Sequence, residues 1–459
     1  MTKKTRLIIF LLCVGCFFVI APILVAYSLG YKFNFKSFEV VTTGGIYVRS
    51  FPVADRIYID FGAPEKPGLF SNSVFVQGLV PQDHTVLIEK TGYHNYQKTL
   101  PVVEKEVTKI EDVLLIKENI IYGLLSKNVD SFSLSKNNQN ILTAKKESPS
   151  TVLNYFNINN PGLPKTFSIT SLGAVSDIQW SDDSRFALVK VLNATVASYY
   201  IVDTSAQALS PIKLAYLDSN SKKLSFNPQN STQLYYLDAN NIYLYDGVLD
   251  QTDPTVKLVI KGVLDYSILN NNFVWLTLDG FLNQSDLLGV LQERLSKNSI
   301  ITKSTLYNIF LADGRTFVQE SSNLFVVNQG ELLAFLSPEP TKKIILSPDS
   351  KHMVYDAGNR INIYSFEDEK YVQLYIGDKI SDLYWLNNDY LIFNDQGKIV
   401  ILEIDWRGSA NSVTLSSEAT LQDNSPIHIQ PSQSFYNRQD NKLYILSENT
   451  LVVSEKLVP

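Results

Sequence analysis

Few residues in this chain could carry out catalysis or bind a metal ion. Cys13 and Cys16 both lie inside one apolar run, so the rest of the chain has neither disulfides nor cysteine metal ligands. No G-x-S-x-G elbow and no phosphate-binding glycine loop occurs. The histidines lack the HxxxH and HExxH spacings that bring two imidazoles to one metal ion; they are His84, His94, His352 and His428. The sequence therefore predicts no catalytic, cofactor-binding or metal site and no enzyme activity.

Acidic residues occur in polar turns, where the choice is between a structural role as turn caps and a chemical role in catalysis. Asp182 and Asp183 are adjacent in "WSDDSR", and Asp349 lies in "LSPDSK". Adjacent carboxylates in a turn do not set the separation that glycoside hydrolysis requires. Aspartate in such turns commonly accepts hydrogen bonds from backbone N–H groups, so we expect these residues to cap turns.

Composition and charge define the class of protein. The chain has 459 residues, with 25 Tyr and 24 Phe but only two Met and two Cys, a composition that favours strands over helices. The net charge is −6, and the residues after the apolar segment carry 37 basic and 46 acidic side chains. A nucleic-acid-binding protein needs a basic surface, so we expect no nucleic-acid partner.

The N-terminal segment predicts a membrane helix. Residues 7–26, "LIIFLLCVGCFFVIAPILVA", contain no charge and are long enough to cross a bilayer as a helix. Lys3, Lys4 and Arg6 precede the segment, which favours a cytoplasmic N-terminus and an extracytoplasmic remainder. We therefore predict a single-pass protein of the plasma membrane. A cleaved signal peptide is the alternative, although the apolar run is longer than usual and lacks a clear cleavage site.

A small β-rich module follows. Short β-forming runs between residues 44 and 117 are separated by Pro, Gly and Asn, a pattern typical of a small antiparallel β-sandwich. Seven residues of the module match the motif of a known family: Ser50, Pro52, Ala54, Asp60, Gly62, Gly92 and Tyr93. At these positions the module resembles the PEGA domain, and the resemblance implies a cell-envelope module without catalytic residues. The match departs from the family where the naming tetrapeptide reads "PVAD" and where Gln82 replaces an expected glycine.

The rest of the chain is repetitive. Eight segments share a large apolar residue, a polar turn and a run of β-formers, at intervals of 36 to 46 residues. This period is that of a four-stranded propeller blade, and blades must stack around an axis to bury their faces. The repeat residues are Leu134, Trp180, Phe226, Ile268, Phe310, Leu346, Trp385 and Ile429. We expect them to pack in the core rather than contact a ligand.

The sequence predicts a propeller of either seven or eight blades. The first repeat is weak, and "QSDLLGVLQERLSKNSI" in the fourth repeat could form strands or a short helix. "WSDDSR" and "LSPDSK" resemble the turns of TolB-like or WD40-like propeller repeats, and no Gly-His…Trp-Asp pair of true WD40 repeats is present.

These features predict a mostly β protein with five parts. Residues 1–6 form a cytoplasmic stub, 7–29 a transmembrane helix, 30–43 a linker, 44–117 the PEGA-like β-sandwich and 118–459 the β-propeller. We expect a non-enzymatic scaffold of the cell envelope that binds a protein partner through the propeller face. The alternative is a carbohydrate-binding or carbohydrate-active protein that contacts cell-wall glycan through the propeller channel.

Overall fold

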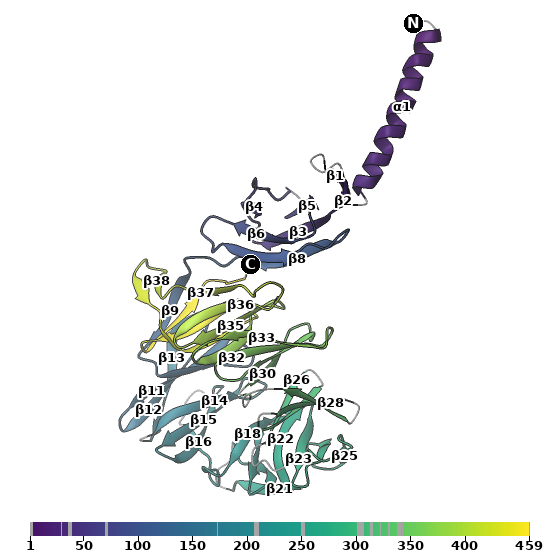
Figure 1. Ribbon diagram of the computed structural model, residues 1–459. Helices are drawn as coiled ribbons and strands as arrows, with labels where there is room; N and C mark the ends of the chain where they lie inside the picture. The colour runs from purple at the N-terminus through teal and green to yellow at the C-terminus, as the bar shows by residue number, and fades with distance from the viewer. Residues whose placement is uncertain are drawn as a thin grey trace. The chain divides into compact units, whose positions relative to one another are not determined.

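The computed structural model describes most of the chain and divides it into two compact units. Unit 1 comprises Met1–Ile120, Ile401–Ser416 and Lys456–Pro459, and unit 2 comprises Ile121–Val400 and Ser417–Glu455. The described residues are 3–28, 30–34, 39–68, 72–171, 173–205, 211–248, 253–300, 307–312, 315–321, 323–328, 331–336, 341 and 343–458. Figure 1 labels the strands and the helix.

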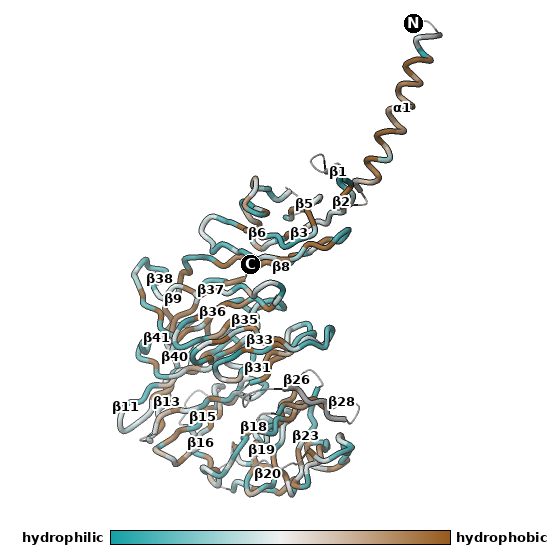
Figure 2. The backbone as a smooth tube through the Cα atoms, viewed as in Figure 1, coloured by the Kyte–Doolittle hydropathy of each residue, from teal (hydrophilic) through white to brown (hydrophobic). Residues whose placement is uncertain are grey.

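The helix α1 spans Lys3–Ser28 and matches the predicted membrane segment. Within it, Thr5–Ala26 is long and apolar enough to cross a bilayer, and no other described helix passes that test. Large side chains all around α1 are exposed, so the helix lacks the single apolar stripe of a helix that packs on a core. Figure 2 shows hydrophobic residues along most of its length. The sequence-based expectation of an N-terminal apolar helix is confirmed.

Unit 1 contains two three-stranded sheets that share one hydrophobic core. One sheet has the order β5 (Ser73–Leu79), β3 (Gly44–Phe51), β8 (Val107–Leu114), and the other β4 (Arg56–Ile59), β6 (Asp83–Glu89), β7 (Tyr96–Pro101). Their core is formed by buried aliphatic residues such as Ile46, Val48, Val86, Ile88 and Ile110.

One expectation for this module was wrong. The strand β3 pairs with β8 in parallel, so the module is not purely antiparallel. Because β8 follows β3 only after four other strands, it is not bound by the hairpin connection that forces neighbouring strands to be antiparallel. The predicted linker 30–43 contains a hairpin of β1 (Tyr31–Asn34) and β2 (Glu39–Thr42).

Unit 2 and the segment 401–416 are built of successive β-meanders. The described residues form seven four-stranded sheets in chain order. The first four are β10 (Ser131–Leu134), β11 (Asn140–Glu147), β12 (Ser150–Asn157), β13 (Asn160–Thr170); β14 (Ala174–Trp180), β15 (Phe186–Asn193), β16 (Val196–Asp203), β17 (Ile212–Lys213); β18 (Lys222–Asn227), β19 (Asn230–Asp238), β20 (Asn241–Asp246), β21 (Thr255–Lys261); and β22 (Val263–Leu269), β23 (Asn272–Thr277), β24 (Leu282–Asp286), β25 (Glu293–Arg294). The other three are β26 (Tyr307–Ala312), β27 (Arg315–Glu320), β28 (Asn323–Asn328), β29 (Glu331–Leu336); β30 (Lys343–Leu346), β31 (His352–Asp356), β32 (Arg360–Ser365), β33 (Lys370–Ile376); and β34 (Ile380–Trp385), β35 (Tyr390–Asp395), β36 (Lys398–Glu403), β37 (Ser412–Thr414).

A further sheet combines strands from both ends of unit 2. Its order is β39 (Pro426–His428), β38 (Glu418–Leu421), β9 (Ile121–Lys127), β42 (Thr450–Ser454), β41 (Lys442–Ser447), β40 (Pro431–Asn437). The first strand of the unit, β9, therefore pairs with the last, β42, and each covers an edge of the other.

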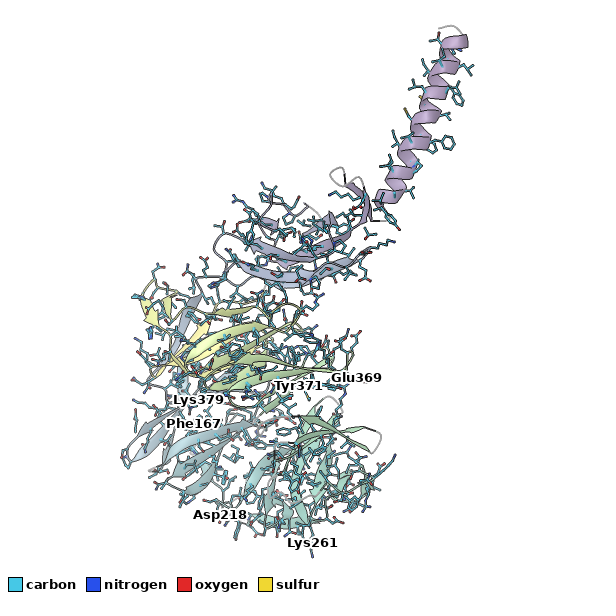
Figure 3. The ribbon with its side chains drawn as sticks, viewed as in Figure 1. Phe167, Asp218, Lys261, Glu369, Tyr371 and Lys379 are labelled. Carbon is cyan, nitrogen blue, oxygen red and sulfur yellow. The ribbon has the colours of Figure 1, made fainter. Side chains whose placement is uncertain are left out.

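Side chains between neighbouring sheets form the cores of unit 2. For example, Phe186 and Ile201 of one sheet pack with Leu234 and Tyr245 of the next. Figure 3 shows side chains filling the spaces between the sheets. The prediction of a mostly β protein built of four-stranded repeats is confirmed, while the borders drawn from the sequence and the number of blades stay predictions.

Candidate functional site

Four of the predicted repeat residues line one cavity in unit 2. Leu134, Trp180, Phe226 and Ile268 are each at the end of the first strand of their sheet, or one residue before it. They line a cavity of about 770 Å³, together with Phe435 of β40. A volume of this size is in the usual range for sites that bind small molecules or peptide side chains.

The remaining repeat residues lie elsewhere. Phe310 and Leu346 pack against a cluster that contains Phe317 and Tyr355. Trp385 is buried at the end of β34. Ile429 is buried just before β40, and its N–H donates to the carbonyl oxygen of Ser417.

The two tryptophans among these residues connect neighbouring sheets in the same way. The indole N–H of Trp180 donates to Oγ of Ser133 at 3.1 Å. The indole N–H of Trp385 donates to the carbonyl oxygen of Ile345 at 3.5 Å. Each acceptor residue lies one position before the repeat residue of the neighbouring sheet: Ser133 before Leu134, and Ile345 before Leu346. The tryptophans therefore pack and orient the first strands and do not offer a free donor to a ligand.

The lining of the cavity includes polar side chains with no partner of their own. Within the described residues, no hydrogen bond or ion pair reaches the side-chain amides of Asn138, Asn270 and Asn271, the ammonium of Lys136 or the carboxylate of Asp182, and all five line the cavity. Each amide can both donate and accept. These side chains are therefore available to a ligand without breaking an internal contact.

The rest of the lining is largely apolar. Phe226, Ile268 and Phe435 are half-buried, so part of each remains accessible. Trp180 is only 5% exposed. The cavity thus combines apolar side chains with neutral amides and one charge of each sign.

Two of the three turn aspartates, Asp183 and Asp349, have the structural role that the sequence predicts; within the described residues the carboxylate of Asp182 accepts no hydrogen bond, so the expectation is wrong for that residue. Asp183 accepts from Ser181 Oγ and from the N–H of Arg185, and Asp349 accepts from Ser347 Oγ and from the N–H of Lys351. Burial alone would raise the pKa of both carboxyl groups, but these hydrogen bonds outweigh it and lower the pKa of each. Turn capping by these two residues is confirmed.

The sequence analysis missed the charged residues three positions before the repeat residues. Asp265 accepts from the N–H of Ile309 and pairs with Nζ of Lys223 at 2.5 Å. Burial raises the pKa of the Asp265 carboxyl, and the nearby ammonium of Lys223 opposes that shift. Asp382 similarly accepts from the N–H of Ser434. The recurring signal was a charged residue at this position, present as Asp177, Lys223, Asp265, Lys343 and Asp382.

The unit 1 residues that suggested a PEGA domain have structural contacts, some within turns and some between strands. Ser50 Oγ accepts from the N–H of Ala54 and donates to the carbonyl oxygen of Pro52, which closes the turn after β3. Asp60 accepts from the N–H of Thr85 and pairs with the imidazole of His84. The other motif residues also have local structural contacts or turn conformations: Gly62 donates to the carbonyl oxygen of Ile59, Gly92 has φ of 80°, and Tyr93 bridges to Lys117.

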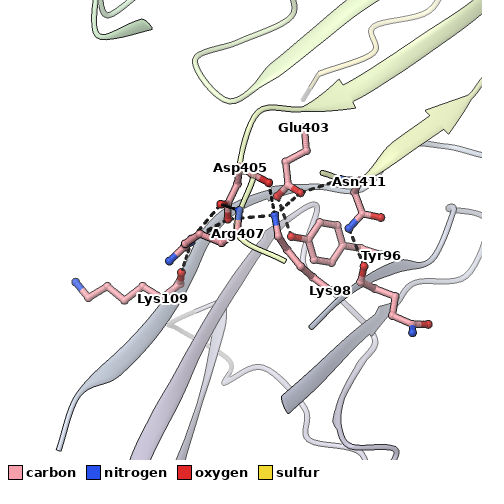
Figure 4. A network of polar contacts seen from close by, with 8 residues as sticks. Tyr96, Lys98, Lys109, Glu403, Asp405, Arg407 and Asn411 are labelled. Carbon is pink, nitrogen blue, oxygen red and sulfur yellow. Dashed lines mark hydrogen bonds and ion pairs between the residues drawn. The ribbon is translucent and has the colours of Figure 1, made fainter. Parts of the chain in front are cut away.

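A buried ion pair network joins segment 401–416 to the rest of unit 1 (Figure 4). Nζ of Lys98, a residue that is 1% exposed, lies 2.7 Å from Oε2 of Glu403 and 3.2 Å from Oδ2 of Asp405. Tyr96 donates to Glu403, and Arg407 pairs with Asp405. Burial raises the pKa of the Glu403 carboxyl, and the nearby ammonium of Lys98 opposes that shift. Since every member has partners, the network has a structural role.

No arrangement for metal binding is present in the described part of the chain, where no three His, Cys, Asp or Glu side chains gather. The neutral cavity of unit 2 is therefore the candidate functional site. Among the described residues that line it, no nucleophile is paired with a base.

Comparisons with known proteins identify a fold but no family. No family model and no curated protein matches the sequence. Among solved structures, Sqt1 of Saccharomyces cerevisiae, a WD40-like β-propeller, has a TM-score of 0.50 at 12% identity, over 75% of this chain and 100% of that one. The β-propeller domain of Cps50 (Swd1) from Myceliophteria thermophila has a TM-score of 0.41 at 9% identity, over 74% of this chain and 99% of that one. The likeness to Sqt1 shows a propeller-like fold.

Proposed function

We propose that this chain is a non-enzymatic, membrane-anchored β-propeller that binds a segment of a partner protein in the cavity of unit 2. The observation that carries the proposal is the set of unpartnered amides of Asn138, Asn270 and Asn271 beside accessible apolar side chains. The seven four-stranded sheets and the sheet that contains β9 and β42 support eight, the higher of the two predicted blade numbers.

The chemistry of the cavity matches a peptide. A peptide backbone presents one donor and one acceptor per residue, and the free asparagine amides can satisfy both. Phe226, Ile268 and Phe435 provide an apolar surface for one side chain of the ligand. Lys136 and Asp182 add one charge of each sign, so the site does not select a strongly charged ligand.

Glycan binding, the alternative from the sequence, has less support in the cavity. A sugar ring binds well against the open face of an aromatic side chain. Trp180 is nearly buried, and its indole N–H is already donated to Ser133. Phe226 and Phe435 are half-buried, so neither presents a fully open ring face.

The anchor gives the site its location. The 26 residues of α1 span about 39 Å, more than the hydrocarbon layer of about 30 Å. With Lys3, Lys4 and Arg6 on the cytoplasmic side, a PEGA-like module and the propeller are outside the plasma membrane, in the cell envelope. The partner is accordingly an envelope protein.

The test is selection of peptides by the full chain in lipid nanodiscs. Random peptides displayed on phage are selected on the wild-type chain and then measured individually by titration calorimetry. We expect enriched peptides with an apolar residue and little net charge, whose binding is weakened by Phe226→Ala and by Asn270→Ala with Asn271→Ala. Enrichment that is unchanged by these substitutions, or retention of purified cell-wall glycan instead of peptides, would refute the proposal.

A further inference from the structure

The turn between β24 and β25 exposes three large aliphatic side chains. Leu288, Val290 and Leu291 are 66%, 56% and 80% exposed. Leu291 also has φ of 53°, in the left-handed region that a leucine rarely adopts. Strain and apolar exposure both cost stability, and their coincidence in one turn indicates a contact with something outside the described fold.

The turn is held firmly on the protein. Leu287 is buried in a core cluster with Trp275, and its carbonyl oxygen accepts from the hydroxyl of Tyr235. Gly289 rests against β21, where a Cβ atom would lie 2.8 Å from the carbonyl oxygen of Val259. Because only glycine allows this approach, the position of the turn is fixed and its apolar tips point outward in a set arrangement.

Three backbone N–H groups of the turn, those of Leu288, Gly289 and Val290, are satisfied internally. Oδ1 of Asp286 accepts from the N–H of Leu288 at 3.1 Å and from that of Val290 at 2.7 Å, while the carbonyl oxygen of Asp286 accepts from the N–H of Gly289. The carbonyl oxygens of Gly289 and Val290 accept from Gln292 Nε2 and from the N–H of Asp286. A turn in water has no need of such internal pairing, whereas one that enters an apolar phase does.

Charges near the turn favour an anionic surface. Lys257 and Lys261 lie on β21, two residues on either side of Val259, and both are exposed. Within the described ranges neither ammonium has a partner; Lys261 is labelled at the periphery in Figure 3. The acidic groups are engaged, since Asp286 caps the turn and Glu293 accepts from Gln284.

We propose that residues 288–291 dip into the surface of an anionic lipid bilayer. The inference rests on the proposed membrane anchoring, because three aliphatic tips and two lysines give only weak, reversible membrane binding by themselves. A chain tethered to the bilayer by α1 keeps the turn at high effective concentration near lipid, where such weak contact becomes populated. The contact limits how the propeller is presented to its partner.

The test uses the full chain in proteoliposomes, with an environment-sensitive fluorophore on a single cysteine. Cys13→Ser and Cys16→Ser remove the native thiols, and Leu291→Cys places the fluorophore on the turn. Val196→Cys is the matched control, because Val196 is 60% exposed on another sheet. We expect blue-shifted emission and quenching by nitroxide-labelled lipid at position 291 but not at 196, in phosphatidylcholine–phosphatidylglycerol vesicles.

Charge reversal by Lys257→Glu with Lys261→Glu should lower the equilibrium constant for insertion by about thirtyfold or more, since each of the two lysines contributes about 1 kcal/mol near an anionic surface. Equal emission and equal quenching at positions 291 and 196 would overturn the proposal. A blue shift at 291 without quenching by lipid nitroxide would also overturn it, because the turn would then be buried against protein. Carbonate extraction tests the membrane anchor separately from the turn. Release of the chain from the vesicles would refute the anchor itself.

Discussion

The carboxylate of Asp265 accepts a hydrogen bond of 2.6 Å from the backbone N–H of Ile309, although the two residues belong to the first strands of neighbouring sheets. Asp382 makes the equivalent contact with the N–H of Ser434 at 2.8 Å. Each aspartate is three residues before a repeat residue, Ile268 or Trp385. Asp265 and Asp382 thus each form a hydrogen bond from one sheet to the backbone of the next. The repeat residues three positions later, Ile268 and Trp385, pack the same strands.

Removal of this carboxylate should destabilise the propeller. Asp265→Ala leaves a buried N–H of Ile309 without an acceptor and Lys223 without its ion pair, so we expect a loss of about 2–3 kcal/mol in the free energy of unfolding. Urea unfolding of the full chain in detergent measures it. Asp182→Ala is the control, since its exposed carboxylate has no partner and the change should stay within about 0.5 kcal/mol. Equal effects of the two substitutions would refute the assigned role of Asp265.

The capping aspartates should make stability depend on acid pH. The pKa of Asp183 and that of Asp349 are lowered in the folded chain by hydrogen bonds, relative to the ordinary value of 3.8. Their contribution to stability is therefore present above about pH 4 and is lost as pH falls through the folded pKa values. Unfolding of the variant Asp183→Asn with Asp349→Asn should match that of the wild type at low pH and show lower stability at neutral pH. A difference between the two chains that is constant with pH would contradict this.

The buried pair of Lys98 and Glu403 should show strong coupling. Lys98→Met leaves the Glu403 carboxylate buried without its cation, and we expect a loss of about 3–5 kcal/mol. Lys98→Met with Glu403→Leu removes both charges and should recover much of that loss. Thermal unfolding followed by circular dichroism provides the comparison. Lys109→Met is the control, as its side chain is 62% exposed. A loss in the double variant equal to the sum of the losses in Lys98→Met and Glu403→Leu would show that the pair is not coupled.

The asparagines of the cavity should contribute to peptide affinity. For a peptide selected by the wild-type chain, Asn270→Ala with Asn271→Ala should lower affinity by about thirtyfold, since it removes two hydrogen bonds worth about 1 kcal/mol each. Asn240→Ala is a matched control, because Asn240 has φ of 59°, close to the 61° of Asn271, yet does not line the cavity. The control separates backbone strain from lost contacts. An equal loss of peptide affinity with Asn240→Ala would mean that the cavity is not the binding site.

The sequence predicted the features that depend on local pattern. The run "LSPDS" becomes the end of β30 at Leu346 and a turn capped by Asp349, and the apolar run becomes α1. Both follow from neighbouring residues alone: a capping side chain two residues from its N–H, and a stretch too apolar for water.

Features that depend on distant pairing could not be predicted in this way. Lys98 and Glu403 are 305 residues apart, so neither residue signals its partner. The parallel pairing of β3 with β8 likewise depends on the path of the chain between them. Ile429, the eighth predicted repeat residue, lies between β39 and β40, while Phe435 of β40 lines the cavity.

The central claim is that the cavity of unit 2 holds a segment of an envelope protein, and site-specific photocrosslinking in intact cells tests it most directly. A benzophenone amino acid replaces Phe226 in the cavity, and in a separate chain it replaces the exposed Tyr216 outside the cavity. The account predicts one crosslinked protein at position 226, mapped to one short peptide, and no such product at 216. Crosslinking at 216 alone, or no crosslinked protein at 226, would contradict it.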